Sequence, residues 1–195
     1  MLTQEIVHNI NQSPQLENVV MKLDMAKAYD RVDWDYLCQV LRQMGFSEVW
    51  IDRVWRLISN VWYSINLNGS RQGFFKSSRG IKQGYPIFPS LFVIGAELLS
   101  RMMNRLPEKG FIPYSSERRG PLITHLCYAD DTILFFSGDP ISLKMMMNEL
   151  ESYETISGQM INKSKSSFYV STNFPQSELN KVEDITGFSQ LQFPM

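Results

Sequence analysis

Three aspartates stand where they could do chemistry. Asp24 ends a β-rich run that begins at Val19, and Asp130 and Asp131 form a pair between two apolar runs. Carboxylates brought to one sheet edge repel each other unless a cation neutralises them, and hard divalent ions prefer oxygen ligands. Two Mg²⁺ ions roughly 3.5–4 Å apart can support phosphoryl transfer. The pattern predicts such a site, and the alternative is a solvated Asp-Asp pair at a hairpin tip.

The runs around these aspartates predict the strands that must position them. Leu122–Tyr128 and Thr132–Phe136 are apolar on either side of Ala129-Asp130-Asp131, which predicts a hairpin with two carboxylates at its tip. Val19–Asp24 predicts a further strand, and Ser167–Val170 predicts the last one.

Apolar residues at helical spacing separate these strands. A second hairpin is expected at Asn68-Gly69, between Tyr63–Leu67 and Gln72–Lys76. Antiparallel hairpins interleaved with long helices predict an α+β fold, an antiparallel sheet packed against helices, in a single domain covering residues 1–195. Helices are expected at Leu2–Ile10, Trp34–Met44 with Gly45 at its end, Ile51–Trp62, Pro89–Met102, Asp139–Leu150 with Gly158 beyond it, and around Leu179–Ile185.

The composition excludes several classes of protein. With 44% apolar and 20% charged residues, the chain is neither disordered nor a disulfide-rich miniprotein. Nineteen basic and twenty acidic residues exclude a generally basic protein but leave room for a local basic surface. The chain has two cysteines, Cys38 and Cys127, and we expect both to be reduced thiols. Its cysteines and histidines do not have the spacing that is typical of a zinc site. The absence of a signal peptide and of a membrane-spanning stretch predicts an intracellular location, nuclear or cytoplasmic.

Four segments together resemble the palm motifs of reverse transcriptases from LINE-type (non-LTR) retrotransposons, especially those of plants. The segments are, in order, Met21–Trp34, Arg79–Gly84, Tyr128–Asp131 and Ser157–Ser166. The resemblance implies a polymerase palm and an RNA-directed DNA polymerase, which extends a DNA primer on an RNA template with deoxynucleotides. It also implies two Mg²⁺ ions, which Mn²⁺ can replace.

The resemblance assigns catalytic roles to single residues. Asp24, Asp130 and Asp131 would hold the metals together with the backbone carbonyl of Met25. Lys165 matches the lysine thought to give a proton to the departing pyrophosphate. The alternative for Lys165 is an ordinary surface lysine.

The resemblance also assigns residues to nucleotide and nucleic acid. Tyr29 would lie beneath the incoming sugar and exclude a 2′-hydroxyl, although a half-buried packing tyrosine explains it too. Gln83 and Gly84 would lie against the incoming nucleotide. Arg79 and Lys82 are expected to contact nucleic acid, and a solvated basic loop is the alternative.

Two residues depart from the family pattern. Tyr85 and Phe88 stand where the family usually has aspartate and serine, and we expect their bulk to lie in a tight turn beside the nucleotide pocket. We also expect a palm shortened at both ends, with partial fingers and without a complete thumb. These features make a catalytically inactive retroelement relic or interaction fragment the second hypothesis. A palm-type nucleotidyl cyclase would share the carboxylates but not the second and fourth segments.

Overall fold

The computed structural model describes residues 18–114, 123–128, 131–171 and 173–191. They divide into two compact units. The sheet unit comprises the described residues within 18–25, 99–152 and 161–191, and the hairpin unit comprises residues 26–98 and 153–160.

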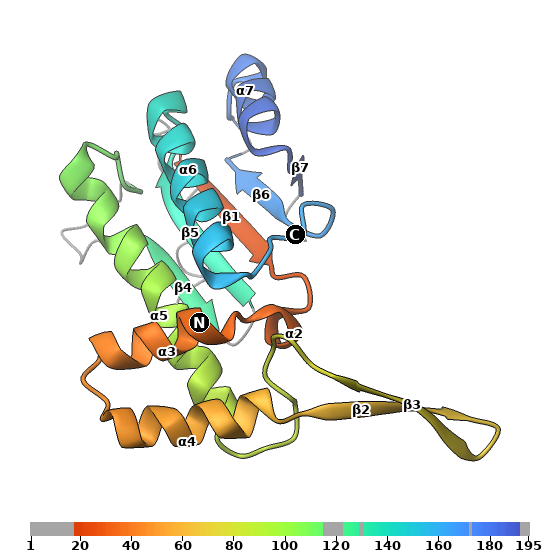
Figure 1. Cartoon of the computed structure of the whole chain (residues 1–195). Coiled ribbons are helices and arrows are strands. Elements are labelled where there is room, and N and C mark those ends of the chain that lie inside the picture. The colour runs from red at the N-terminus through yellow and green to blue at the C-terminus, as the bar shows by residue number, and fades with distance from the viewer. Residues whose placement is uncertain (1–17, 115–122, 129–130, 172, 192–195) are drawn as a thin grey trace. The chain divides into compact units, whose positions relative to one another are not determined.

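A five-stranded sheet forms the centre of the sheet unit, in the order β4-β5-β1-β6-β7 (Figure 1). The pairs β4–β5, β5–β1 and β1–β6 are antiparallel, which confirms the predicted α+β layer with an antiparallel sheet. The short last strand adds in parallel to β6 and makes the sheet mixed. The strands are β1 (Asn18–Asp24), β4 (His125–Tyr128), β5 (Asp131–Ser137), β6 (Ser167–Val170) and β7 (Ser189–Gln190).

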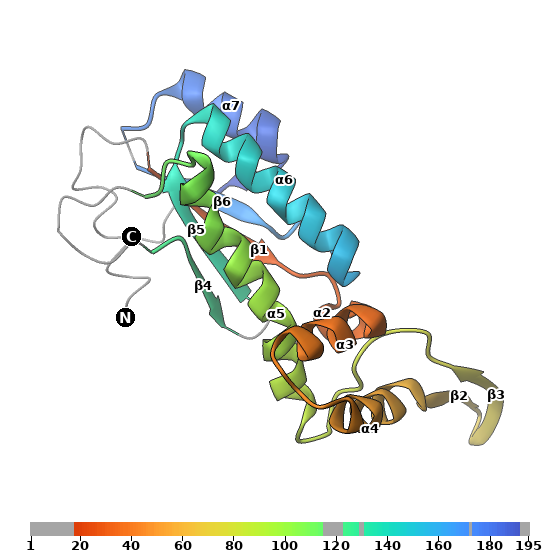
Figure 2. The same cartoon turned by 60° about the vertical axis from the view of Figure 1, so that its left-hand side comes forward.

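One face of this sheet is buried along β1 and β5. Val19, Met21 and Leu23 alternate along β1 and are each 0% exposed, as are Leu134 and Phe136 on β5. Helix α6 (Pro140–Ser157) lies along one side of the sheet in both views (Figure 1, Figure 2). Alternation along a strand puts the intervening residues on the opposite side, so the sheet has a helix-covered face and a second, more open face.

The open face carries a smaller apolar cluster and then becomes polar. Val20 and Phe135 are buried there, and Ile133 and Tyr169 pack against them partly exposed. Further along β1 on the same face, the side chains are only partly buried. We call this surface, which ends at Asp24, the carboxylate face.

Three helices of the hairpin unit are α2 (Ala28–Arg31), α3 (Trp34–Gln43) and α4 (Glu48–Ser59). Asp33 caps α3 by accepting a hydrogen bond from the Tyr36 N–H at 2.9 Å. The chain then leaves α3 through Gly45, whose φ of +84° suits glycine. The helices expected at Trp34–Met44 and Ile51–Trp62 are confirmed, except that α4 ends before Trp62.

A two-stranded ribbon, β2 (Trp62–Leu67) and β3 (Ser70–Lys76), confirms the predicted hairpin. Asn68 and Gly69 have φ of +50° and +82°, the left-handed pair that a tight two-residue turn requires. Figure 1 shows the ribbon extending from the end of α4 as an arm of this unit. Trp62, which helical spacing had assigned to α4, instead opens β2.

The remaining elements follow the expected order. Helix α5 (Phe88–Arg105) begins at the proline-containing turn and leads into a 3-10 turn, Leu106–Lys109. Helix α7 (Gln176–Thr186) precedes β7. The expected helix at Leu2–Ile10 lies outside the described residues. Within the described part of the chain, no helix is long and apolar enough to cross a membrane.

Candidate active site on the carboxylate face

Asp24 and Asp131 lie directly opposite each other in the sheet. The last residue of β1 pairs with the first residue of β5 in an antiparallel register. Side chains of directly opposite residues lie about 4.5–5.5 Å apart at Cβ, and like charges at that separation destabilise the pair. The fold thus brings together two carboxylates that are 107 positions apart in the chain. Asp130 lies outside the described residues.

A lysine on the same face partly balances these charges. Lys22 Nζ lies 3.5 Å from Asp131 Oδ1, with the two side chains 45% and 54% exposed. A pair this open to water contributes little, about 0–1 kcal/mol. Sequence reasoning missed Lys22, although period-two alternation along β1 places it on the same face as Asp24. Because Lys22 carries one positive charge and the two aspartates carry two negative charges, the net charge at the end of the strand pair remains negative.

The fourth sequence segment holds the backbone of Asp24. Its carbonyl accepts a hydrogen bond from the Asn162 N–H at 2.8 Å, and its N–H donates to Ser166 Oγ at 3.1 Å. The Asn162 carbonyl in turn accepts from the Lys165 N–H at 3.1 Å and the Ser166 N–H at 2.8 Å. This turn therefore fixes Asp24 from both sides and places the exposed Lys165 on the same turn. Motif spacing gave no sign of the Ser166 contact.

The donor chemistry of this face fits a divalent cation. Asp24 and Asp131 offer the hard oxygen ligands that Mg²⁺ and Mn²⁺ prefer, and a cation would relieve their mutual repulsion. Met25, 8% exposed, lies beside Asp24 and bridges to Ile161. Among the described residues, which omit Asp130, no three His, Cys, Asp or Glu side chains gather closely enough to hold a metal.

The other predicted site residues belong to the hairpin unit, where hydrogen bonds join the first and second segments. The Gly80 N–H donates to the Val32 carbonyl, and the Ile81 N–H donates to the Tyr29 carbonyl, both at 2.8 Å. Trp34 Nε1 donates to the Gly80 carbonyl at 2.7 Å. The loop that carries Arg79, Lys82, Gln83 and Gly84 is therefore anchored beside Tyr29.

The aromatic residues near this loop occupy different environments. The ring of Tyr29 stacks on Phe92, with centroids 4.5 Å apart and an interplanar angle of 15°. Phe88 is only 1% exposed and therefore part of the core, whereas Tyr85 is 45% exposed. Lys82 Nζ lies 5.8 Å from the centroid of the Tyr85 ring. Of the two departures from the family pattern, only Tyr85 is thus available to a ligand.

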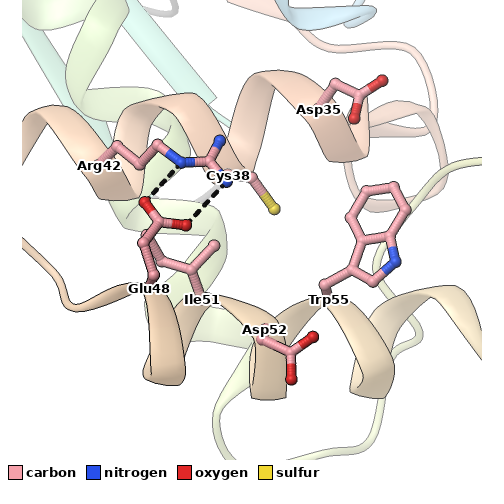
Figure 3. A pocket seen from close by; sticks show the side chains of 7 residues that line it. All are labelled: Asp35, Cys38, Arg42, Glu48, Ile51, Asp52 and Trp55. Atoms are coloured by element: carbon pink, nitrogen blue, oxygen red, sulfur yellow. Dashed lines mark hydrogen bonds and ion pairs between the residues drawn. The ribbon is translucent and has the colours of Figure 1, made fainter.

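A pocket of the hairpin unit lies between α3 and α4 and has a volume of about 310 Å³ (Figure 3). Arg42 and Glu48 form a two-pronged ion pair across it, at 2.7 and 3.1 Å. Burial raises the pKa of the Cys38 thiol, and the positive charge of Arg42 opposes this shift. Because its strongest charged groups satisfy each other, we assign no catalytic role to this pocket.

Known proteins resemble this chain in sequence. The profile described as reverse transcriptase (RNA-dependent DNA polymerase) matches residues 1–186. The retrovirus-related Pol polyprotein of the type-1 retrotransposable element R2 from Popillia japonica is 27% identical over 169 residues, covering 77% of this chain and 27% of that protein. An uncharacterized mitochondrial protein of Arabidopsis thaliana is 42% identical over 67 residues, covering 34% of this chain and 55% of that protein.

Solved structures resemble the chain in fold. Telomerase from Candida albicans, solved in complex with a fragment of telomeric RNA, matches with a TM-score of 0.63 and 13% identity. The match covers 89% of this chain and 32% of the telomerase chain. The matches thus span less than two thirds of the length of each relative named here. The matched profile covers nearly the whole sequence, and the chain belongs to the reverse transcriptase family, with relatives among the non-LTR retrotransposon enzymes.

Proposed function

We propose that this chain carries the palm of an RNA-directed DNA polymerase that transfers nucleotides with two divalent metal ions. The observation that carries the proposal is the direct cross-strand pairing of Asp24 with Asp131 on the carboxylate face. Bound Mg²⁺, or Mn²⁺ in its place, would supply charge neutralisation to the reacting phosphate. The substrates would be deoxynucleotides, a DNA primer and an RNA template.

The sheet unit would hold the metals and assist the leaving group. Asp24, Asp130 and Asp131 would be the carboxylate ligands, and the Met25 carbonyl would complete one coordination shell. In the reaction the primer 3′-hydroxyl would lose its proton to water, its oxygen would bond to the α-phosphorus, and the bond from that phosphorus to the pyrophosphate oxygen would break. Lys165 would give its proton to that departing oxygen. The turn that fixes Asp24 also carries Lys165, which supports this assignment.

The hairpin unit would position the nucleotide and the template. Tyr29 would exclude a ribose 2′-hydroxyl, and its stacking on Phe92 supports a ring held in one orientation. Gln83 and Gly84 would lie against the incoming nucleotide, with Arg79 and Lys82 on nucleic-acid phosphates. The anchored backbone of this loop supports these roles.

We also propose that both units serve one polymerase domain over residues 1–195, in an intracellular protein that acts in the nucleus or the cytoplasm. Its origin would be a plant retrotransposon of the LINE type. The 42% identity with the Arabidopsis thaliana protein supports that origin.

Primer extension on an RNA template tests the polymerase function. Wild type, Asp24→Asn and Asp184→Asn are compared with Mg²⁺ and with Mn²⁺; Asp184 is an exposed residue of α7 and serves as the matched control. Wild type and Asp184→Asn should extend the primer. Asp24→Asn should be at least about a hundredfold slower, because a catalytic ion supplies several kcal/mol of stabilisation. A wild-type rate no higher than that of Asp24→Asn contradicts the proposal.

The second candidate is a catalytically inactive relic or interaction fragment. Tyr85 and Phe88, in place of the aspartate and serine usual in the family, are the observations that favour it. A folded wild-type protein that extends no primer under any of these conditions would support this candidate.

A further inference from the structure

The ribbon formed by β2 and β3 has two chemically different faces, which follow from its register. Directly opposite residues share a face, and successive residues alternate, except at a β-bulge in β3, where the unpaired Gly73 shifts the register between Gln72 and Phe74. One face, here called the basic face, carries Trp62, Ser64, Asn66, Arg71, Phe74 and Lys76. The other, the uncharged face, carries Tyr63, Ile65, Leu67, Ser70, Gln72 and Phe75.

Both cations of the ribbon therefore lie on the face that also presents Trp62 and Phe74. Every residue of the two strands is exposed, with Trp62 at 58% and Phe74 at 73%. Within the described part of the chain, neither Arg71 nor Lys76 forms an ion pair with an acidic side chain. The face thus offers unneutralised positive charge beside open aromatic rings.

The sequence around the ribbon reinforces this charge. Residues 53–96 contain no aspartate or glutamate, although the whole chain has a net charge of −1. Tyr85 contributes to this by standing where the resemblance leads us to expect an aspartate. The cations of the stretch are Arg53, Arg56, Arg71, Lys76, Arg79 and Lys82.

A pocket adjoins the basic face at the end of the ribbon that begins with Trp62. Its volume is about 340 Å³, and Trp62 belongs to both the pocket and the face. Arg56, Lys82 and Tyr85 also line it, with Lys82 over the Tyr85 ring. Trp62 thus joins the basic face to this pocket, and the two together, here called the strip, carry both positive and aromatic side chains.

We propose that this strip binds single-stranded nucleic acid. Bases would stack on Trp62, Phe74 and Tyr85, and phosphates would pair with Arg71, Lys76 and Lys82. Stacking on exposed rings along a positive surface is how proteins hold single strands without reading sequence. An isolated two-stranded ribbon is only marginally stable in water, so a ligand along the strip would also stabilise it.

This binding surface goes beyond the polymerase function and does not require metal. It can therefore be tested in EDTA, with the metal site excluded. The probe is a fluorescent oligouridylate of about 16 nucleotides, long enough for a typical single-strand site. Oligothymidylate and a duplex of the same length serve as comparison ligands. Fluorescence anisotropy measures the affinity of the protein for all three.

Phe74 and Phe75 provide a matched pair for the test. They are adjacent, exposed and aromatic, but they lie on opposite faces. Phe74→Ala should weaken binding about 5- to 100-fold, the loss expected for one stacked base, and Phe75→Ala should change it less than about twofold. Equal losses from the two variants, or a duplex bound as tightly as the single strand, would overturn the proposal.

Charge and the role of Tyr85 are tested separately. Arg71→Gln and Lys76→Gln should each reduce the salt slope of binding by about 0.7, the value for one lost phosphate contact on a single strand. Tyr85→Asp should weaken binding more than Tyr85→Phe, which keeps the ring. An unchanged salt slope in both glutamine variants contradicts the phosphate contacts.

Two results separate this proposal from its alternatives. Asp24→Asn should bind the oligonucleotide like wild type, so loss of polymerase activity can be distinguished from loss of oligonucleotide binding by the strip. If wild type binds no oligonucleotide but self-associates in sedimentation, and Phe75→Ala abolishes that association, the ribbon is a protein interface. The proposal is then wrong.

Discussion

At the scale of single residues, Gly80 shows how tightly the first and second segments are joined. Its φ is +89°, and a Cβ added there would lie 2.5 Å from the backbone oxygen of Asp30. That oxygen belongs to the main chain and cannot turn aside as a flexible side chain could. Any side chain at position 80 must therefore push apart two segments that hydrogen bonds hold together.

Gly84 provides a matched control, because its φ of +100° is similar but an added Cβ meets nothing within 4 Å. Gly84→Ala should lower the free energy of unfolding only by the cost of the strained backbone, about 1–3 kcal/mol. Gly80→Ala should lose about 1–3 kcal/mol more through overpacking. Urea denaturation measures both values, and equal losses would contradict the close approach.

The two cysteines should differ in reactivity. Cys38 is 4% exposed, and burial raises the pKa of its thiol, whereas Cys127 is exposed. The thiolate is the reactive species, so a raised pKa keeps Cys38 protonated to a higher pH. At pH 8 an aromatic disulfide reagent should label Cys127 faster, and the Cys38 rate should still rise as the pH increases. The Cys38→Ser and Cys127→Ser variants allow the labelling rate of each thiol to be measured separately. Equal labelling rates would show that the Cys38 thiol is accessible to the reagent, which contradicts its burial.

At the scale of elements, the register of β1 and β5 decides what lies on each face. Leu134 is 0% exposed on the covered face, and its neighbour Ile133 is only partly buried on the open face. Leu134→Ala should cost about 2–5 kcal/mol of unfolding free energy, and Ile133→Ala no more than about 2 kcal/mol. Thermal or urea unfolding of the two variants measures this difference. A larger loss for Ile133→Ala would mean that the register is shifted by one residue.

Local sequence signals predicted most elements because their causes are local. The Asn68-Gly69 turn depends on the backbone preference of two residues, and the start of α3 depends on one cap by Asp33. Strand β7 escaped prediction because two residues carry no periodicity and its pairing with β6 is remote in sequence. The assignment of Trp62 to α4 was wrong because helical spacing continued past Asn60, where the helix has already ended.

The carboxylate face was predictable to a similar degree. Asp130 and Asp131 stood out by their position between apolar runs and Asp24 by its place at the end of a β-rich run, and the resemblance supplied the roles proposed for them. Lys22 and Ser166 did not stand out, because a lysine in a strand and a serine in a turn are common in any sequence. Their importance follows from contacts with Asp131 and Asp24 that only the folded chain forms.

At the scale of the whole molecule, the two units divide the proposed work. The sheet unit carries the carboxylates and Lys165, and the hairpin unit carries the nucleotide-binding loop and the basic face of the ribbon. Binding of a single strand and binding of metal should therefore be separable by mutation. Catalysis would require both units, whereas the metal site would require only the sheet unit.

Metal binding by the full chain tests the central claim most directly. Calorimetric titration with Mn²⁺ or Mg²⁺ is compared for wild type, Asp24→Asn, Asp131→Asn and the control Asp184→Asn. Wild type and the control should bind the ion alike, and each of the other two variants should bind it at least about tenfold more weakly, because removing one charged ligand costs more than 1.4 kcal/mol. Binding by Asp24→Asn that equals wild type would contradict the assignment of the carboxylate face as the metal site.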